Sequence, residues 1–204
     1  MPAAQRAGIG TLGFFSTAVG PEMPSILMVS SHASLAALEA SVVKLMADTQ
    51  YTKALEAFAN APGLGYLRME TSLLRAFDGM PQIEAPPTDE KRPARIFELR
   101  IYESNNSVSL RKKIGMFEEG EIAIFRKTGL LPVFFGYTIA GPKMPNLTYM
   151  LAFDDLAARE KNWRTFVTSP EWKKLSATPG LSDAEVVSNI SSSILSPLPF
   201  SPIR

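Results

Sequence analysis

The 204-residue chain contains no cysteine and a single histidine, His32. Disulfide bonds are therefore excluded, and so are thiolate or multi-histidine zinc sites within one chain. An oxygen-ligand site for magnesium or calcium would need spaced Asp or Glu ligands, and no loop of the sequence offers that pattern. From these absences we expect no metal and no cofactor.

The chain also lacks an excess of either charge and any long apolar run. Its formal net charge is +1, so it lacks the excess of positive charge that attracts nucleic acid or an anionic membrane. No run approaches the ~20 apolar residues of a membrane helix. The weakly apolar stretch 7–20 resembles a poor signal peptide, but it matches 128–141 deep in the second half, so we interpret it as a strand that the mature protein keeps. We expect no nucleic-acid or membrane partner and a cytoplasmic location.

A repeat organises what is present. The pattern Gly-Pro-X-Met-Pro occurs at 20–24 and again at 141–145, and Leu-Ala-Ala-X-Glu follows each copy, at 35–39 and at 156–160. From Gly20 to Leu74 the first half aligns with the second without a gap. A repeat of this size is a small domain, because solenoid units run only about 20–50 residues. The sequence therefore predicts a tandem duplication.

Hydrophobic periodicity, caps and turn residues predict the elements of the second half. They are a strand over 95–102, a helix over 107–127 capped by Ser107 or Ser109, strands over 131–140 and 146–153, a helix from Asp154 or Asp155 to about Val167 that restarts at Pro170, and a strand over 184–195. This β-α-β-β-α-β order is ferredoxin-like. One face of its four-stranded sheet takes the helices, and the other face needs a different cover.

The first half is predicted from the alignment. It has a hairpin over 9–19 and 25–31, a helix pair over 35–59 and a last strand over 66–74. The counterpart of the strand 95–102 would precede Met1, so the first unit lacks its first strand. Either the sequence as given starts late, or another chain or segment covers an exposed sheet edge. We favour the late start and keep the second alternative open.

Proline and charge mark the boundaries between these units. The segment 81–94 holds four prolines and the run Asp89-Glu90-Lys91-Arg92, which is typical of an extended linker. Three more prolines predict an extended C-terminal arm over 197–204. We therefore predict an incomplete repeat over 1–80 and a complete domain over 95–196.

Three motifs of the second half carry a family resemblance. They are Glu98-Leu99-Arg100 with Tyr102, the aromatic strand that ends in Asp154-Asp155, and Pro170-Glu171-Trp172. Together they resemble the NIPSNAP family over about Arg95 to Pro202, and the first half is similar to a degenerate copy. This sequence departs from the family's Trp-and-Tyr strand pattern, because it has Tyr149 and Phe153 in that strand.

The resemblance implies mainly a fold. NIPSNAP domains look like members of the dimeric α/β-barrel group, in which two ferredoxin-like sheets pack their open faces into one barrel. We therefore expect an α+β protein of two tandem ferredoxin-like units that pack as such a barrel. The family supplies no established catalytic residues, and the vesicle-transport and mitochondrial-quality-control roles of its mitochondrial members transfer poorly to this chain.

The first predicted strand of the complete domain holds the best candidate site residues, Glu98, Arg100 and Tyr102. We expect Phe97, Leu99 and Ile101 to meet the helices, which would point the polar trio into the barrel lumen. There the trio could orient and protonate a small substrate, with Glu98 as acid or base. The alternative, which we favour, is a structural charge pair of Arg100 with a carboxylate.

Other candidates have simpler interpretations. Asn189 and Ser191 on the last strand either face the same cavity or fill it as hydrogen-bonded side chains. Trp163 and Trp172 are expected to be core anchors, and His32 a half-buried packing residue or cap. The pair Lys112-Lys113 and the pair Lys173-Lys174 are predicted to be solvated helix faces.

Two functional hypotheses follow. The first is a non-catalytic binding or assembly module, a homo-oligomer whose barrel either docks partners or holds a small apolar ligand. The second is a cofactor-independent enzyme of the monooxygenase or isomerase type that uses Glu98, Arg100 and Tyr102. We favour the first, because no motif pairs a nucleophile with a base.

Overall fold

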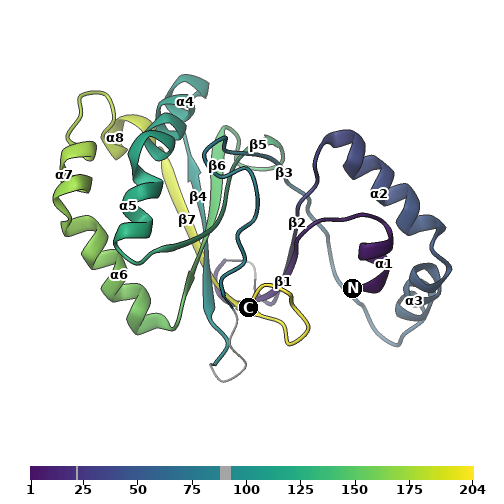
Figure 1. The fold of residues 1–204 in the computed structure, drawn as a ribbon. Helices are drawn as coiled ribbons and strands as arrows, with labels where there is room; N and C mark the ends of the chain where they lie inside the picture. Colours follow the sequence, from purple (N-terminus) through teal and green to yellow (C-terminus); the bar gives the residue numbers. More distant parts are fainter. Residues whose placement is uncertain (22, 88–92) are drawn as a thin grey trace.

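The computed structural model describes residues 1–21, 23–87 and 93–204, and its centre is one antiparallel sheet (Figure 1). The strands lie in the order β2-β1-β7-β4-β6-β5-β3. Their bounds are β1 Leu12–Val19, β2 Ile26–Ser30, β3 Leu73–Ala76, β4 Ile96–Glu103, β5 Leu131–Ala140, β6 Asn146–Phe153 and β7 Asn189–Pro197.

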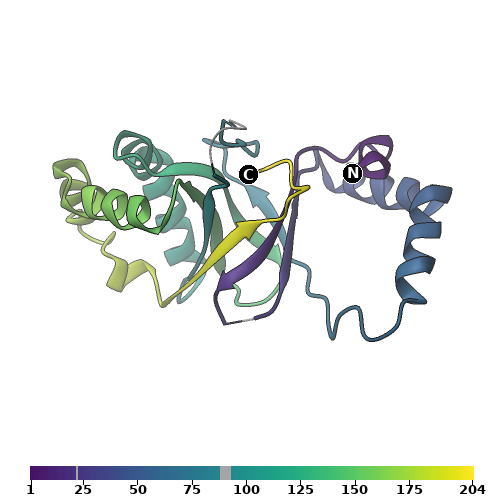
Figure 2. The same cartoon turned by 90° about the horizontal axis from the view of Figure 1, so that it is seen from below.

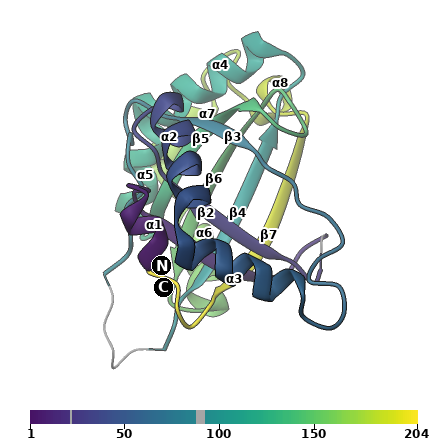
Figure 3. The same ribbon diagram turned by 90° about the vertical axis from the view of Figure 1, so that its right-hand side faces the viewer.

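Two groups of helices flank this sheet. The first half contributes α1 Pro2–Arg6, α2 Leu35–Ala47 and α3 Thr49–Ala59; the second contributes α4 Ser107–Met116, the π-helix η1 Phe117–Glu121, α5 Ile122–Lys127, α6 Leu156–Thr168, α7 Pro170–Ser176 and α8 Asp183–Val186. Figures 2 and 3 show α1–α3 on one side of the sheet and α4–α8 on the other. Within the described residues, none of these helices has the length and apolar character needed to cross a membrane.

The second half has the ferredoxin-like strand order β7-β4-β6-β5, as the sequence predicts. Asp155 caps α6 by accepting a 2.7 Å hydrogen bond from the Ala158 N–H, and Pro170 opens α7. Three details differ from the prediction. Asn106, and neither Ser107 nor Ser109, caps α4. The predicted helix over 107–127 contains the π-helix η1. The strand predicted from residue 184 starts at Asn189, because a capping box of Ser182 and Glu185 folds the preceding residues into α8.

In the first half, the hairpin and the helix pair form as predicted, but the last strand is shorter. It covers Leu73–Ala76, whereas a strand was expected over 66–74. The segment 81–87 of the predicted linker runs beside β5, where Glu84 N–H donates to the Val133 carbonyl at 2.8 Å. Residues 88–92 of that linker lie outside the described residues. The predicted domain boundaries stay predictions.

The strands of the two halves join in two matching registers. Leu74 pairs with Thr138 and Ala76 with Gly136 where β3 meets β5. The aligned partners, Leu195 with Thr17 and Pro197 with Phe15, pair where β7 meets β1. Both ladders shift register at the aligned place, just before the Leu74 and Leu195 pairs. The two halves therefore contribute equivalent edges to one curled sheet, in agreement with the predicted barrel-type fold, while the duplication itself stays an interpretation of the sequence repeat.

Two apolar clusters lie on opposite faces of the sheet. The larger lies under α4–α7 and includes Phe117, Phe125, Phe135 and Tyr149, all with 0–1% of their surface exposed. The other joins both halves and consists of Phe15, Phe97, Val133, Met150, Ala152, Leu195 and Ile203. The predicted C-terminal arm belongs to this second cluster, because Ile203 is buried in it and Ser201 Oγ accepts a 2.9 Å hydrogen bond from the Phe14 N–H.

Candidate functional site

Strand β4 turns its polar side chains toward the helices, so the predicted lumen orientation of Glu98, Arg100 and Tyr102 is wrong. Phe97 packs in the apolar cluster on the opposite face, whereas Tyr102 belongs to the cluster under the helices. Alternation could not give the orientation, because β4 is a central strand with both faces covered. The groups that pair with the charged residues come from α6, far along the chain.

Glu98 is the centre of this polar arrangement. It has no exposed surface, and five donors reach its carboxylate. Arg159 donates from Nε and Nη2 at 2.8 and 2.6 Å, Trp163 from Nε1 at 2.8 Å, Ser192 from Oγ at 2.6 Å, and Arg100 from Nη1 at 2.8 Å. The fork of Arg159 spans both carboxylate oxygens, which is the strong bidentate form of this interaction. Glu98 therefore ties β4 to α6 and to β7.

This environment fixes the charge of Glu98. Burial alone would raise its pKa, but the hydrogen bonds from Arg159 and Ser192, the charge of Arg100 and the hydrogen bond from Trp163 together lower the pKa to about 2. The carboxylate therefore stays ionised at neutral pH. A group with this pKa is poorly matched to general acid or base catalysis, for which a pKa near the working pH is needed.

Arg100 links Glu98 to a pair of tyrosines. Its Nη2 donates to Tyr102 Oη at 3.2 Å, and Tyr149 Oη donates to Tyr102 Oη at 2.9 Å. The guanidinium carbon lies 4.7 Å from the ring centroid of Trp163, a cation–π contact. Burial raises the pKa of both phenols, so they stay protonated. Among the described residues, Arg100 Nε is buried without a hydrogen-bond partner.

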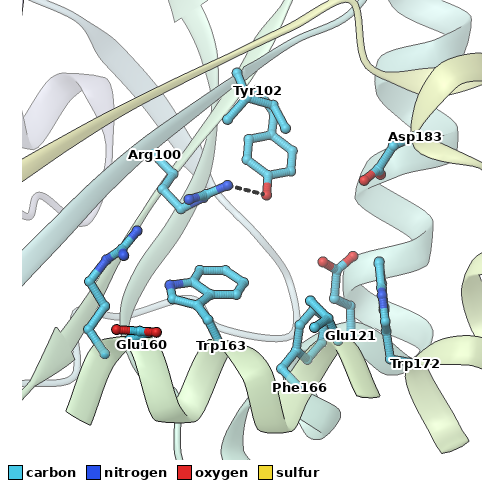
Figure 4. Close-up of a pocket in the computed structure, with 11 residues that line it drawn as sticks. Arg100, Tyr102, Glu121, Glu160, Trp163, Phe166, Trp172 and Asp183 are labelled. Carbon is cyan, nitrogen blue, oxygen red and sulfur yellow. Dashed lines mark hydrogen bonds between the residues drawn. The ribbon is translucent and has the colours of Figure 1, made fainter. Parts of the chain in front are cut away.

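A cavity of about 340 Å³ opens beside this arrangement (Figure 4). Its wall combines aromatic rings with charges of both signs. The lining residues are Arg100, Tyr102, Glu121, Arg159, Glu160, Trp163, Phe166, Val167, Trp172, Asp183 and Ile190. Trp163 and Trp172 pack against the helix-side core as expected, but both are only half-buried and both line the cavity.

A buried ion pair closes one side of the cavity. Lys113 has no exposed surface, which contradicts its predicted place on a solvated helix face; Lys112 beside it is exposed as predicted. Lys113 Nζ lies 3.1 Å from Glu121 Oε2 and 3.2 Å from Asp183 Oδ1. The available signal was the spacing, since Lys113 and Glu121 fall among the apolar positions of the predicted helix. Glu121 ends the π-helix η1, a distortion that is frequent at functional sites.

Glu121 is the titratable group of the cavity. Burial raises its pKa, the charge and hydrogen bond of Lys113 lower it, and Asp183 raises it again, so that the pKa becomes about 7. The direction follows from burial, which outweighs the lowering by Lys113 and Arg100. Asp183 shares the charge of Lys113, so an ionised Glu121 in this buried place would be only partly compensated.

The structure does not bring Asn189 and Ser191 to this site. Asn189 Nδ2 donates to Glu103 Oε1 at 2.8 Å at the far end of β4, and Ser191 Oγ accepts from Lys143 Nζ at 3.1 Å. Their neighbour Ser192 is the residue of β7 that reaches Glu98. His32 lies between Ser30 and Ser41 as a half-buried packing residue. Within the described part of the chain, no group of three or more His, Asp or Glu side chains could hold a metal ion.

Comparison with known proteins places this site in a family. The NIPSNAP family model matches residues 97–202, which is a little over half of the chain. The chain belongs to the NIPSNAP family. The matched region contains β4 from Phe97 onward, all the helices from α4 to α8, and therefore every residue that lines the cavity.

Solved structures give two kinds of likeness. A NIPSNAP-like domain protein from Burkholderia xenovorans is 25% identical, with 53% of this chain and 90% of that chain covered and a TM-score of 0.48. A "putative monooxygenase" from Lactobacillus acidophilus is 10% identical, with 95% and 83% covered and a TM-score of 0.59. One from Fusobacterium nucleatum is 9% identical, with 93% and 76% covered, also at 0.59. Because these last two cover nearly the whole chain, the likeness in fold extends over both halves of this NIPSNAP protein. No curated protein matches the chain.

Proposed function

We propose that this NIPSNAP protein binds a small, partly apolar carboxylate in the cavity between β4, α6 and α7, without transforming it. The observation that carries the proposal is the guanidinium of Arg100, which lines the cavity beside the ring of Trp163. A carboxylate oxygen is the acceptor that a guanidinium binds most strongly.

The rest of the wall supports the apolar body of such a ligand. Trp163, Phe166 and Trp172 supply flat apolar surfaces, and a volume of about 340 Å³ suits a small molecule, since ligand sites span about 300–1,000 Å³. Glu121 and Asp183 line the opposite wall (Figure 4). They would repel a second anionic group and accept hydrogen bonds from a ligand's hydroxyl or ammonium.

Binding without catalysis fits the state of Glu98. Its carboxylate is occupied by five donors and its pKa is about 2, so its role is to position Arg100 and Trp163. We prefer this cavity to the barrel lumen expected from the sequence, because Phe15, Phe97 and Ile203 pack together on the lumen side. The homo-oligomeric state and the cytoplasmic location stay predictions.

Native mass spectrometry of the purified protein is the first test. A discrete added mass that disappears on denaturation, and that belongs to a carboxylic acid, would support the proposal and identify the ligand. A panel of small aromatic and aliphatic carboxylates, with the matching amides as controls, then tests the recognition by ligand-observed NMR. We expect the acids to bind and the amides to fail.

A pair of arginine variants makes the test specific. Arg100→Lys keeps the charge but loses the fork, so we expect binding to weaken about tenfold or more. Arg111→Lys, at an exposed position of α4, should bind as the wild type does. Equal affinity of all three proteins for the acids would contradict the proposal.

One observation favours a second function, a proton-transfer enzyme that uses Glu121. This carboxyl lines the cavity, and its pKa of about 7 suits general acid–base catalysis near neutral pH. The full-length structural neighbours are called putative monooxygenases, although at 9–10% identity this likeness concerns the fold alone. Turnover of a bound carboxylate that Glu121→Gln abolishes, with binding retained, would establish this alternative.

A further inference from the structure

The cavity beside β4 has two ends of opposite charge (Figure 4). The guanidinium of Arg100 lies at one end, and the carboxylates of Glu121 and Asp183 lie at the other. Lys113 Nζ contacts both carboxylates, at 3.1 and 3.2 Å, but Lys113 has no exposed surface. A ligand therefore meets the two acids and not this ammonium group. The wall offers donors for an anion at one end and acceptors for a cation at the other.

The ring of Tyr102 separates the two ends. Its Oη accepts a 3.2 Å hydrogen bond from Arg100 Nη2. Lys113 Nζ, which donates to Glu121 Oε2 at 3.1 Å, lies 5.6 Å from the centroid of the same ring. A ligand that reaches both ends must therefore carry its two charged groups roughly the length of an aromatic ring apart.

Flat apolar surface connects the two ends. Trp163, Phe166 and Trp172 line the cavity, and the ring centroid of Phe166 lies 5.7 Å from that of Trp163 and 4.5 Å from that of Trp172. Each indole already has a cation of the chain beside it, Arg100 at Trp163 and Lys113 at Trp172. The rings therefore suit an apolar ligand body and leave the recognition of charge to the two ends.

The charges of the wall match a ligand with two charged ends. Apart from Glu121, the described charged groups at the wall and directly behind it are the cations of Arg100, Arg159 and Lys113 and the carboxylates of Glu98 and Asp183. Glu160 also lines the cavity, but it pairs with Arg164 at 2.7 Å. Three cations against two carboxylates leave one positive charge while Glu121 is protonated, and no net charge once Glu121 is ionised. The protonated site suits a simple carboxylate, and the ionised site suits a ligand that carries both an ammonium and a carboxylate.

We propose that the ligand of this cavity is an amino carboxylate whose ammonium and carboxylate stand at opposite ends of a short apolar body. This inference rests on the proposed function, because the carboxylate end is the one that Arg100 binds. It adds that the ammonium contacts Glu121 and Asp183. It also adds that the Glu121 carboxyl releases its proton to solvent when the ligand binds.

The ionisation of Glu121 couples ligand binding to pH. In the free cavity, burial raises the pKa of Glu121 to about 7 against the lowering by Lys113. A ligand ammonium beside this carboxyl lowers the pKa, whereas a simple carboxylate at Arg100 offsets a cation and raises it. The affinity for an amino carboxylate should therefore rise with pH, and the affinity for a simple carboxylate should fall. The charged and titratable groups that face Glu121 are Lys113, Asp183, Arg100, Tyr102 and Tyr149, and α7 contributes the uncharged ring of Trp172.

Two probes of the same shape test the proposal. Para-(aminomethyl)benzoate carries both charged groups, and para-ethylbenzoate has a methyl group in place of the ammonium. Titration calorimetry at about pH 6 and about pH 8 should show that the amino probe binds about tenfold more tightly at the higher pH, whereas the ethyl probe loses affinity. Phenylglycine, an isomer of the amino probe with its ammonium next to its carboxylate, should bind at least about tenfold more weakly than the amino probe.

The same titrations count protons without any variant. In two buffers of different ionisation enthalpy at about pH 7, binding of the amino probe should release about half a proton, because Glu121 is half-protonated there. The ethyl probe should take protons up. Glu121→Gln should lose both the pH dependence and the preference for the amino probe, and Glu119→Gln, at an exposed position of η1, should keep both.

The outcomes separate this inference from the proposed function. If the ethyl probe binds but the amino probe gains no affinity at the higher pH and releases no proton, the inference is wrong while the carboxylate site stands. Phenylglycine that binds as tightly as the amino probe, or a preference for the amino probe that survives in Glu121→Gln, also overturns the inference alone. If neither probe binds at any pH, or if the amide of the amino probe binds as tightly as the acid, both proposals fail.

Discussion

The indole Nε1 of Trp163 donates a 2.8 Å hydrogen bond to Oε2 of Glu98, 65 residues earlier in the chain. Arg159, one helical turn before Trp163, donates a hydrogen bond to each oxygen of the same carboxylate. One face of α6 thus holds a buried charge on the central strand, and it does so next to the cavity. Stability and the proposed binding site therefore depend on the same carboxylate.

Replacing this carboxylate should destabilise the protein strongly. In Glu98→Gln, the guanidinium groups of Arg100 and Arg159 lose their counter-charge in a buried place, and removal of one partner from such a pair costs about 3–5 kcal/mol. Urea unfolding followed by circular dichroism measures the loss. The matched control is Glu103→Gln at the half-buried end of the same strand, which keeps an acceptor for Asn189, and there we expect a change below about 1 kcal/mol. Similar losses in the two variants would show that Glu98 is not the anchor.

Acid should remove the contribution of Glu98. Its folded pKa of about 2 lies below its ordinary value of 4.5, so the stabilisation is present above pH 4.5 and is lost as the pH falls toward about 2. The shift corresponds to about 3 kcal/mol. Denaturant midpoints of the wild type should fall over this range more steeply than those of Glu98→Gln. Parallel curves would contradict the ionised, hydrogen-bonded state.

Much of the fold could be predicted from local patterns. The strands over 131–140 and 146–153 form with the predicted bounds, because each is an apolar run that ends at a turn or a cap. Asp155 and Pro170 start their helices for reasons that the adjacent residues contain. The prediction of one strand over 184–195 does not include helix α8, although the Ser182–Glu185 capping box is a local signal for it.

The orientation of the site could not be predicted in the same way. Glu98, Arg100 and Tyr102 do share one face of β4, as the alternation indicates. Their polarity would place them on the open face only if the helix-covered face had no donors for the Glu98 carboxylate. Here Arg159 and Ser192 supply the donors from 61 and 94 residues away. Lys113 is a different case, because its partner Glu121 lies only eight residues further along the chain and both occupy apolar positions of the predicted helix. Only the contact with Asp183, 70 residues further along, lies beyond that local signal.

The two halves offer a matched test of core packing. Trp172 contacts Phe166 with ring centroids 4.5 Å apart. Lys113 Nζ makes a cation–π contact with the Trp172 ring, 5.4 Å from the ring centroid. We expect Trp172→Ala to cost about 3 kcal/mol, at the low end for a large-to-small core change because the ring is half-buried. Tyr51 is the aligned residue of the first half, and Tyr51→Ala should cost less. A loss below about 1 kcal/mol for Trp172→Ala in denaturant titration would show that the ring is not part of the core.

Glu121 should give the protein an opposite pH dependence in the neutral range. Its folded pKa of about 7 lies above its ordinary value of 4.5, so the folded state binds the extra proton. The corresponding stability is complete below pH 4.5 and is lost as the pH rises through about 7. The full effect is up to about 3 kcal/mol. Besides its partner Lys113, the charged and titratable groups around it are Asp183, Arg100, Tyr102 and Tyr149.

The variant Glu121→Gln isolates this contribution, because its amide can still accept from Lys113 but cannot ionise. Urea midpoints measured from about pH 4.5 to pH 8 should fall in the wild type relative to the variant. His32, whose pKa burial lowers, acts in the opposite direction but is the same in both proteins, so the difference between their curves belongs to Glu121. Glu119→Gln, on an exposed position of the same π-helix, should keep the wild-type slope. If the wild type and Glu121→Gln keep a constant difference across the range, Glu121 is ionised throughout, and the proton-transfer alternative loses its acid–base group.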